Sequence, residues 1–217
     1  MRDLDIAVRL RPAREISGDI YDFFEHGDFG VVAFGDVSGK GAAAALYGAL
    51  VSGLLRTLAY RRRNPSELLR MLNDVLLERR VDAQYIALAV LLWEPQHRRF
   101  VMANAGAVPP MICRGGEIIK PRVEGVPAGL LEGREYDEVI FDAQPGDVVL
   151  LYSDGIQDQP NPKGDEYGRT RLAHALKKLC DLPVEQIADE LLRDVDVFTD
   201  GAPAFDDQTI VVMKISE

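Results

Sequence analysis

The chain turns sharply at Gly35-Asp36-Val37-Ser38-Gly39-Lys40-Gly41, between an apolar run over residues 29–34 and a helical run that begins at Ala42. The apolar run predicts a strand, which places Asp36 at a strand end. The glycines of the turn permit backbone angles that other residues adopt only with strain. A carboxylate held there, with loop carbonyls beside it, suits a hard cation. The turn therefore predicts one ligand of a metal site.

Two other interpretations apply to this turn. A phosphate-binding loop needs four residues between its first Gly and its Gly-Lys pair, followed by Ser or Thr. Here Gly35 and Gly39 enclose three residues, and Gly41 follows Lys40, so the spacing argues against nucleotide binding. The second interpretation is a structural glycine-rich turn in which the Asp is incidental, and the motif alone does not decide against it.

Further acidic residues recur beside predicted strands. Asp19 lies at the start of one strand, and Asp154 directly follows the apolar run 148–151. Asp206 and Asp207 immediately precede the last strand. Because each adjoins a predicted central strand, these carboxylates can converge at one rim of a pair of sheets.

The acidic turns favour metal-assisted chemistry. Several like charges gathered together are costly unless something neutralises them. Oxygen donors without thiols or imidazoles fit Mg²⁺ or Mn²⁺ rather than Zn²⁺ or Cu²⁺. Two such cations roughly 3.5–4 Å apart would clamp a phosphoryl group and activate a water for in-line attack. The sequence therefore predicts hydrolysis of a phosphate ester.

Hydrophobic periodicity divides the chain into runs of strands and runs of helices. Strands are predicted over residues 4–10, 20–24, 29–34, 85–93, 100–105, 111–113, 136–141, 147–152 and 209–215. Helices are predicted over residues 42–60, 65–80, 168–179 and 183–197. This clustering favours an α+β fold with largely antiparallel sheets over a parallel β-α-β arrangement.

The helix after the Asp36 turn carries a stripe of small residues. Its members are Ala42, Ala45, Ala49 and Gly53. We expect the stripe to face a sheet, since small side chains allow the backbone to approach closely. A partner that shifts this helix, or the one after Asn64, is then expected to assemble or dismantle the metal site from a distance.

Composition excludes several classes of protein. The 217 residues predict a single domain over 1–217. Acidic residues outnumber basic ones, 35 to 25, and the formal charge of −10 argues against nucleic acid as the main partner. The basic cluster Arg61-Arg62-Arg63 is interpreted as a solvated helix end.

No apolar run approaches a membrane span and no signal peptide is evident, so we expect a cytoplasmic protein without a membrane partner.

The cysteines and histidines predict no further site. Cys113 and Cys180 are isolated and are interpreted as a reduced pair of small apolar residues. His26, His97 and His174 lie apart, which argues against a zinc site or a catalytic triad.

Five motifs stand in the order and approximate spacing of one family. They are Ser17-Gly18-Asp19-Ile20-Tyr21-Asp22-Phe23-Phe24, the turn over 35–41, Asn104-Ala105-Gly106, Tyr152-Ser153-Asp154-Gly155 and Asp206-Asp207-Gln208-Thr209. Over about residues 4–215 the chain resembles the bacterial PPM/PP2C serine/threonine phosphatases of the sporulation-phosphatase and stress-regulator type (SpoIIE/RsbU-like).

The resemblance implies an α-β-β-α sandwich of two mainly antiparallel sheets, with two Mn²⁺ or Mg²⁺ ions between the sheets. By motif match, Asp36 would bridge both ions and the Val37 carbonyl would join one of them. Asp154 and Asp206 would complete the shell of one ion, and Asp19 would serve the other, mainly through water. Asp36 and Asp154 are thus the expected catalytic residues.

Three further positions are less fixed by the resemblance. Asp207 occupies a position where relatives carry Asn or Asp, and we include it among the expected metal ligands. Arg14 matches a phosphate-binding Arg of eukaryotic relatives, although an exposed Arg beside Pro12 is an equal alternative. Ala107 replaces the usual His after Asn104-Ala105-Gly106, which puts a substrate contact or the turn geometry there in doubt but not the activity.

The resemblance implies a phosphoserine/phosphothreonine phosphatase. Its substrate would be a phosphorylated anti-anti-sigma (STAS) protein, whose dephosphorylation releases a sigma factor. The alternative is a non-catalytic interaction module that keeps the fold, and the presence of all matched acids favours the enzyme. Relatives usually carry a sensor domain before the catalytic one. Because the family pattern begins close to Met1, we expect either an excised domain or regulation by a separate activating partner.

Overall fold

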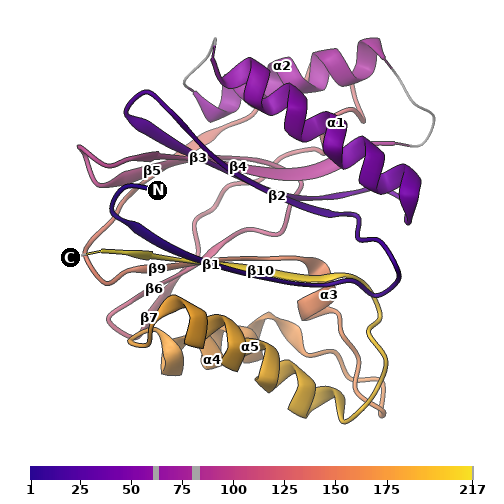
Figure 1. The fold of residues 1–217 in the computed structure, drawn as a ribbon, viewed down its shortest axis with the longest axis vertical. Helices are drawn as coiled ribbons and strands as arrows, with labels where there is room; N and C mark the ends of the chain where they lie inside the picture. The colour runs from indigo at the N-terminus through magenta and orange to yellow at the C-terminus, as the bar shows by residue number, and fades with distance from the viewer. Residues whose placement is uncertain (61–63, 80–83, 217) are drawn as a thin grey trace. The chain divides into compact units, whose positions relative to one another are not determined.

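The computed structural model describes residues 1–60, 64–79 and 84–216 (Figure 1). Their contacts separate into two units, each built from several segments of the chain. The first unit contains Met1–Arg2, Ile16–Pro109 and Arg122–Ala143. The second contains Asp3–Glu15, Pro110–Pro121 and the described residues from Gln144 onward. The cluster at 61–63 lies outside the described residues, and the single domain over 1–217 stays a prediction.

The first unit is an antiparallel sheet with two helices on one face (Figure 1). Its strands, in the order β2-β3-β4-β5-β8, are β2 (Asp19–His26), β3 (Phe29–Val37), β4 (Ile86–Glu94), β5 (Arg99–Ala105) and β8 (Glu138–Asp142). Its helices are α1 (Ala42–Ala59) and α2 (Pro65–Glu78). Pro65 stands at the first position of α2, where the missing N–H costs no helical hydrogen bond.

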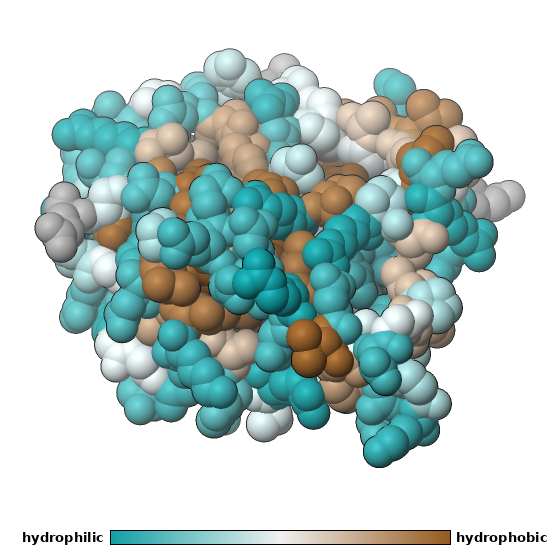
Figure 2. All heavy atoms as spheres, turned by 60° about the horizontal axis from the view of Figure 1, so that its bottom comes forward, coloured by the Kyte–Doolittle hydropathy of each residue, from teal (hydrophilic) through white to brown (hydrophobic). Residues whose placement is uncertain are grey.

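The second unit is a separate antiparallel sheet with its own helices. Its strands, in the order β1-β10-β9-β6-β7, are β1 (Leu4–Arg11), β10 (Gln208–Ile215), β9 (Val148–Tyr152), β6 (Met111–Arg114) and β7 (Glu117–Ile119). The helices are α3 (Asp154–Gln157), α4 (Gly168–Leu179) and α5 (Val184–Thr199). Figure 2 brings the side of α4 and α5 forward and shows separate hydrophobic groups among hydrophilic side chains. Every residue of β9 is buried, which makes it a central strand of this unit.

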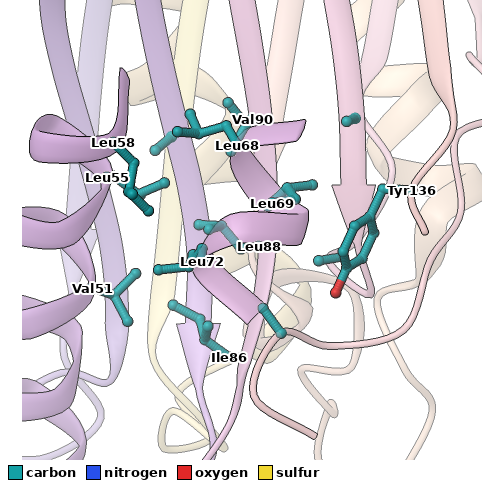
Figure 3. Close-up of a cluster of buried hydrophobic side chains, with 14 of the residues drawn as sticks. Val51, Leu55, Leu58, Leu68, Leu69, Leu72, Ile86, Leu88, Val90 and Tyr136 are labelled. Atoms are coloured by element: carbon teal, nitrogen blue, oxygen red, sulfur yellow. The ribbon is translucent and has the colours of Figure 1, made fainter. Parts of the chain in front are cut away.

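Apolar side chains from α1, α2 and β4 form the core of the first unit (Figure 3). The helices contribute mainly leucines, and β4 contributes Ile86, Leu88 and Val90. Apolar area removed from water stabilises by roughly 25 cal/mol per Å². This cluster therefore fixes both helices against the sheet that carries the Asp36 turn.

The predicted strands and helices are confirmed, with small changes at their ends. β2 runs over Asp19–His26 instead of residues 20–24, and β8 begins at Glu138 instead of residue 136. β7 and α3 were not predicted, because elements of three and four residues are too short to show a period. Cys113 and Cys180 are both free and buried, in keeping with their interpretation as apolar residues.

The predicted sheet-facing stripe of α1 is wrong. The buried side of the helix carries Ala44, Tyr47, Gly48, Val51, Leu55, Leu58 and Ala59, whereas Ala42, Ala49 and Gly53 are exposed. Close approach occurs at Gly48 instead, since a Cβ there would lie 2.5 Å from Ile20 Cγ2 of β2. A polar contact fixes the same rotation, because Asp22 of β2 accepts hydrogen bonds from Ser52 Oγ at 2.5 Å and Arg56 Nε at 2.9 Å.

Among the described residues, α1 is the one helix with the length and apolar composition of a membrane span. The sequence-based expectation that no apolar run approaches such a span is therefore wrong for residues 42–59. A core helix of a soluble protein passes the same test, and α1 contributes seven buried residues to the first unit.

The two glycines of α1 should respond oppositely to alanine. Gly48→Ala should lower the free energy of unfolding by about 1–3 kcal/mol, because the new methyl overpacks against Ile20. Gly53→Ala should raise it by about 0.5–1 kcal/mol, because no atom lies within 4 Å of its Cβ position and alanine favours the helix. Urea unfolding followed by circular dichroism measures both. Destabilisation of equal size at both positions would contradict the rotation of α1 described here.

Candidate active site

Asp19 and Asp36 lie directly opposite each other across the β2–β3 ladder. Residues paired in this way project to the same face of a sheet, with their Cβ atoms about 4.5–5.5 Å apart. Asp19 is buried and Asp36 is half-buried. The hairpin therefore holds two carboxylates side by side at one end of its strands.

Gly18 lies against this pair, close to two oxygen atoms. A Cβ at Gly18 would lie 3.2 Å from Asp36 Oδ1 and 3.4 Å from the Val37 carbonyl oxygen. The Val37 N–H donates to the Gly18 carbonyl at 3.3 Å, which holds the two segments together. A carboxylate oxygen and a carbonyl oxygen that lie close to one point are donors that Mg²⁺ and Mn²⁺ accept. These residues fit the implied cation.

The loop that follows β3 is fixed by hydrogen bonds to the start of β4. Ser38 N donates to the Tyr85 carbonyl at 2.9 Å, and Tyr85 N donates to Ser38 Oγ at 2.8 Å. Gly39 and Gly41 have φ angles of 91° and 75°, in the left-handed region that favours glycine. The turn into α1 therefore has a defined shape, which fixes the backbone next to Asp36.

In the second unit, Ser153 ties Asp154 to the loop before β10. Ser153 N donates to the Thr209 carbonyl at 3.0 Å. Its Oγ donates to the Asp207 carbonyl at 3.0 Å and accepts from Thr209 N at 2.9 Å. These bonds place Asp154, the first residue of α3, beside the segment that contains Asp206 and Asp207.

Gly155 allows this approach. A Cβ at Gly155 would lie 2.0 Å from the Asp207 carbonyl oxygen, much closer than non-bonded atoms come. Glycine is therefore required at this position by the contact between the start of α3 and the acidic loop. Its side-chain hydrogen has a structural role that the motif alone does not reveal.

Gln159 anchors the same loop and was missed by the sequence analysis. Its buried side chain donates from Nε2 to the Pro203 carbonyl at 3.1 Å. Its Oε1 accepts from Phe205 N at 2.9 Å and from Gln208 Nε2 at 3.0 Å. Gln159 therefore fixes both flanks of Asp206-Asp207, and no local pattern around it distinguishes it from an exposed glutamine.

Tyr152 links the acidic residues to α4. Burial raises the pKa of Tyr152, and nearby Arg169, which donates from Nε to the tyrosine oxygen at 3.0 Å, opposes part of that rise. The hydroxyl is therefore protonated at neutral pH. Tyr152 directly precedes Ser153, so this contact adds a further constraint on the start of α3.

The segment that carries Arg14 touches the acidic loop. The N–H of Ala13 donates to Asp207 Oδ1 at 2.8 Å. Arg14 itself is exposed. The contact brings the backbone next to Arg14 close to Asp207 within the second unit, while a phosphate-binding role for its side chain stays a prediction.

The loop with Ala107 is built by Asn104 without a histidine. Asn104 Nδ2 donates to the carbonyls of Ala107 and Val123 at 2.9 and 3.0 Å, and its Oδ1 accepts from Ala107 N at 2.8 Å. Gly106, with a φ of 82°, makes the turn between them. Since Ala107 contributes only backbone groups, its side chain is not needed for the turn geometry.

The structure thus brings the predicted residues together as two sets. Asp19, Asp36 and Val37 form one set in the first unit, and the second unit holds the others: Arg14, Asp154, Asp206 and Asp207. Within residues 1–60, 64–79 and 84–216, no group of three or more His, Cys, Asp or Glu side chains forms a cation site. The complete ligand set across both units stays a prediction.

Comparison with known proteins gives one consistent family. The chain matches the family model described as stage II sporulation protein E (SpoIIE) over residues 28–216. It is 28% identical to the phosphoserine phosphatase RsbU of Bacillus subtilis (strain 168) over 158 residues, which cover 71% of this chain and 47% of that protein. The chain spans less than half the length of the curated relatives that it matches.

Solved structures show the fold. The SiaA-PP2C domain of Pseudomonas aeruginosa matches with a TM-score of 0.86 at 20% identity, covering 96% of this chain and 85% of that one. RsbX in complex with magnesium matches with a TM-score of 0.73 at 16% identity, covering 100% of this chain and 97% of that one. The predicted PP2C-like α+β fold is thereby confirmed.

Two neighbouring glutamines provide a test of how the acidic loop is held. Gln159→Ala should lower the free energy of unfolding by about 1–3 kcal/mol, because the buried Nε2 of Gln208 and the part-buried N–H of Phe205 lose their acceptor. Gln157→Ala is the control, since the buried Oε1 of Gln157 has no hydrogen-bond partner among the described residues. Urea unfolding should show the loss for Gln159→Ala and little change for Gln157→Ala. Equal losses of stability in the two variants would contradict the role of Gln159 in anchoring the acidic loop.

Proposed function

The chain belongs to the SpoIIE family, and from this premise we propose that it is a metal-dependent protein phosphatase that hydrolyses phosphoserine and phosphothreonine. The observation that carries the proposal is the Asp19–Asp36 pair, with Asp36 Oδ1 and the Val37 carbonyl oxygen both lying close to Gly18. Carboxylates held opposite each other repel one another unless a positive charge is nearby. They are useful where a divalent cation binds.

The proposed ligands of Mn²⁺ or Mg²⁺ are those that the family resemblance implies. They are Asp19, Asp36, the Val37 carbonyl, Asp154, Asp206 and Asp207. Two bound ions would polarise the phosphoryl oxygens and supply an activated water. Donors of this kind leave little role for a nucleophilic side chain.

The residues of the chain itself orient the reaction. The Ser38–Tyr85 hydrogen bonds fix the backbone next to Asp36, and Ser153 fixes Asp154 relative to Asp207. Arg14, whose neighbour Ala13 is bound to Asp207, is proposed to bind the substrate phosphate with its guanidinium. Asp36 and Asp154 are the proposed catalytic carboxylates.

The proposed substrate is a phosphorylated anti-anti-sigma protein of the STAS type, in a partner-switching pathway that controls a sigma factor. Similarity to RsbU, which is named a phosphoserine phosphatase, supports phosphoserine as the target. Release of phosphate from a phosphoserine peptide, compared with the matching phosphotyrosine peptide, tests this class. Preference for the phosphotyrosine peptide would reject it.

The alternative function is a non-catalytic interaction module with the same fold. The ordered Asp19–Asp36 pair and the hydrogen-bonded Asp206-Asp207 loop favour the enzyme, because a module without chemistry has no need for crowded carboxylates. A purified chain without turnover under any divalent cation would support the module instead.

Removal of metal should abolish activity. After EDTA treatment and buffer exchange, hydrolysis of p-nitrophenyl phosphate should fall to background, and added Mn²⁺ or Mg²⁺ should restore it. The reason is the all-oxygen donor set, which binds these cations reversibly. Undiminished turnover by the chelated protein would contradict the proposal.

Asp36→Asn should lower turnover by about 10²–10³-fold or more, because the proposed bridging ligand loses its charge. Without metal, its free energy of unfolding should equal or exceed that of the parent, since Asp19 no longer opposes a second carboxylate. Asp28→Asn, at the other end of the same hairpin, is the control and should leave turnover unchanged. A large loss of stability in metal-free Asp36→Asn would identify Asp36 as a structural turn residue.

A further inference from the structure

A groove of about 400 Å³ lies between α4 and α5 in the second unit. Residues on one side of α4 form one wall, and residues on α5 form the other. None of the proposed site residues lines it. The face that carries these helices is the one turned forward in Figure 2, where hydrophobic groups are exposed among hydrophilic ones.

Two cations, Arg171 and Lys178, lie along the α4 wall with His174 between them. Arg171, His174 and Lys178 follow one another at positions i, i+3 and i+7, so they lie on one side of the helix. At 1.5 Å per residue, the outer two α-carbons are separated by roughly 10 Å along the helix axis. Lys178 is exposed and makes no hydrogen bond or ion pair with any described residue.

Two acids also line the groove. Glu190 forms an ion pair with Arg193, and Asp194 accepts a hydrogen bond from the Tyr167 hydroxyl at 2.6 Å, which orients the carboxylate but leaves its negative charge. Arg171 lies over the ring of Phe198 at 4.3 Å, a contact that orients the guanidinium without neutralising it. Three cations (Arg171, Lys178 and Arg193) and two carboxylates (Glu190 and Asp194) line the groove, so its lining carries a formal charge of about +1 in a chain whose formal charge is −10.

Apolar surface accompanies the charge. Val197 on α5 lines the groove and is 75% exposed, and Leu179 and Ala175 line it from α4. A small inorganic anion would use one or two of the cations and none of this surface. A linear segment with acidic and apolar side chains matches both the spacing of the cations and the apolar wall.

We propose that the groove between α4 and α5 is a docking site for an acidic, amphipathic peptide segment of a partner protein. Its carboxylates would pair with Lys178 and Arg171, and its apolar side chains would pack against Val197. Electrostatic attraction of this kind mainly accelerates association and selects the partner. The inference is independent of the proposed phosphatase activity, because it uses none of the metal-site residues.

The test measures binding of a fluorescein-labelled peptide with repeating Glu-Glu-Leu-Leu, by fluorescence anisotropy on the full chain. Control peptides carry Gln or Lys in place of each Glu, so that the negative charges are removed or reversed. The acidic peptide should bind more tightly than either, and its binding should weaken as salt screens the charges. Equal binding of the Gln peptide would overturn the proposal.

Charge reversal on α4 then locates the site. Lys178→Glu should weaken binding of the acidic peptide by about fivefold to tenfold, as expected when an exposed pair becomes a repulsion. Lys177→Glu is the control, because Lys177 pairs with Glu117 of β7 outside the groove, and it should change the affinity less than about twofold. Val197→Asp replaces an apolar side chain of the α5 wall with a negative charge, and it should also weaken binding of the acidic peptide.

Turnover of p-nitrophenyl phosphate should be the same in all three variants, which separates this proposal from the proposed function. Similar affinities for Lys177→Glu and Lys178→Glu would place the peptide elsewhere and reject the groove. Vesicles of phosphatidylglycerol are the competing probe. If they bind in a Lys178-dependent manner and the acidic peptide does not, the groove recognises a lipid surface and the peptide proposal is wrong.

Discussion

The register of the β2–β3 ladder is the constraint on which the acids of the first unit depend. Side chains alternate between the two faces of a strand, so a slip of one residue would send Asp19 and Asp36 to opposite faces. Gly35 allows the other neighbour of β3 to approach closely, since a Cβ there would lie 2.2 Å from the Ala87 carbonyl oxygen of β4. The paired strands thereby hold the two carboxylates next to each other, and Gly18 lies against Asp36.

In the second unit, the acidic residues are held in place by side-chain hydrogen bonds instead of by a strand ladder. Asp206 and Asp207 precede a strand instead of belonging to one, so no ladder holds them. Side chains do this instead: Ser153 binds the loop on one side, and the buried amide of Gln159 binds it on the other. Buried polar groups of this kind are stable only when their hydrogen bonds are complete, which makes the loop geometry sensitive to single substitutions.

Much of this arrangement could be predicted from the sequence, for a physical reason. Apolar runs such as 148–151 and the glycine turn around Asp36 are local signals. Each can be recognised from neighbouring residues alone, without knowledge of the fold. The rotation of α1 is not local, because both the predicted stripe and the observed buried side have helical spacing. Asp22 on β2 helps to fix the rotation by binding Ser52 and Arg56, 30 and 34 residues further along the chain. Gln159 escaped prediction similarly, since its partners Pro203, Phe205 and Gln208 lie 44 to 49 residues away.

The two sets of acids differ in the length of chain that must be ordered to form them. Asp19 and Asp36 belong to one hairpin, a unit that forms within about 1–10 μs in isolated peptides. Ser153 and Asp207 are separated by 54 residues, which include α4 and α5. Because the entropy lost on closing a loop grows with its length, bringing Asp154 to the loop of Asp207 costs more chain entropy than bringing Asp19 opposite Asp36. The two sets of acids therefore differ in the conformational freedom that the chain loses to form them.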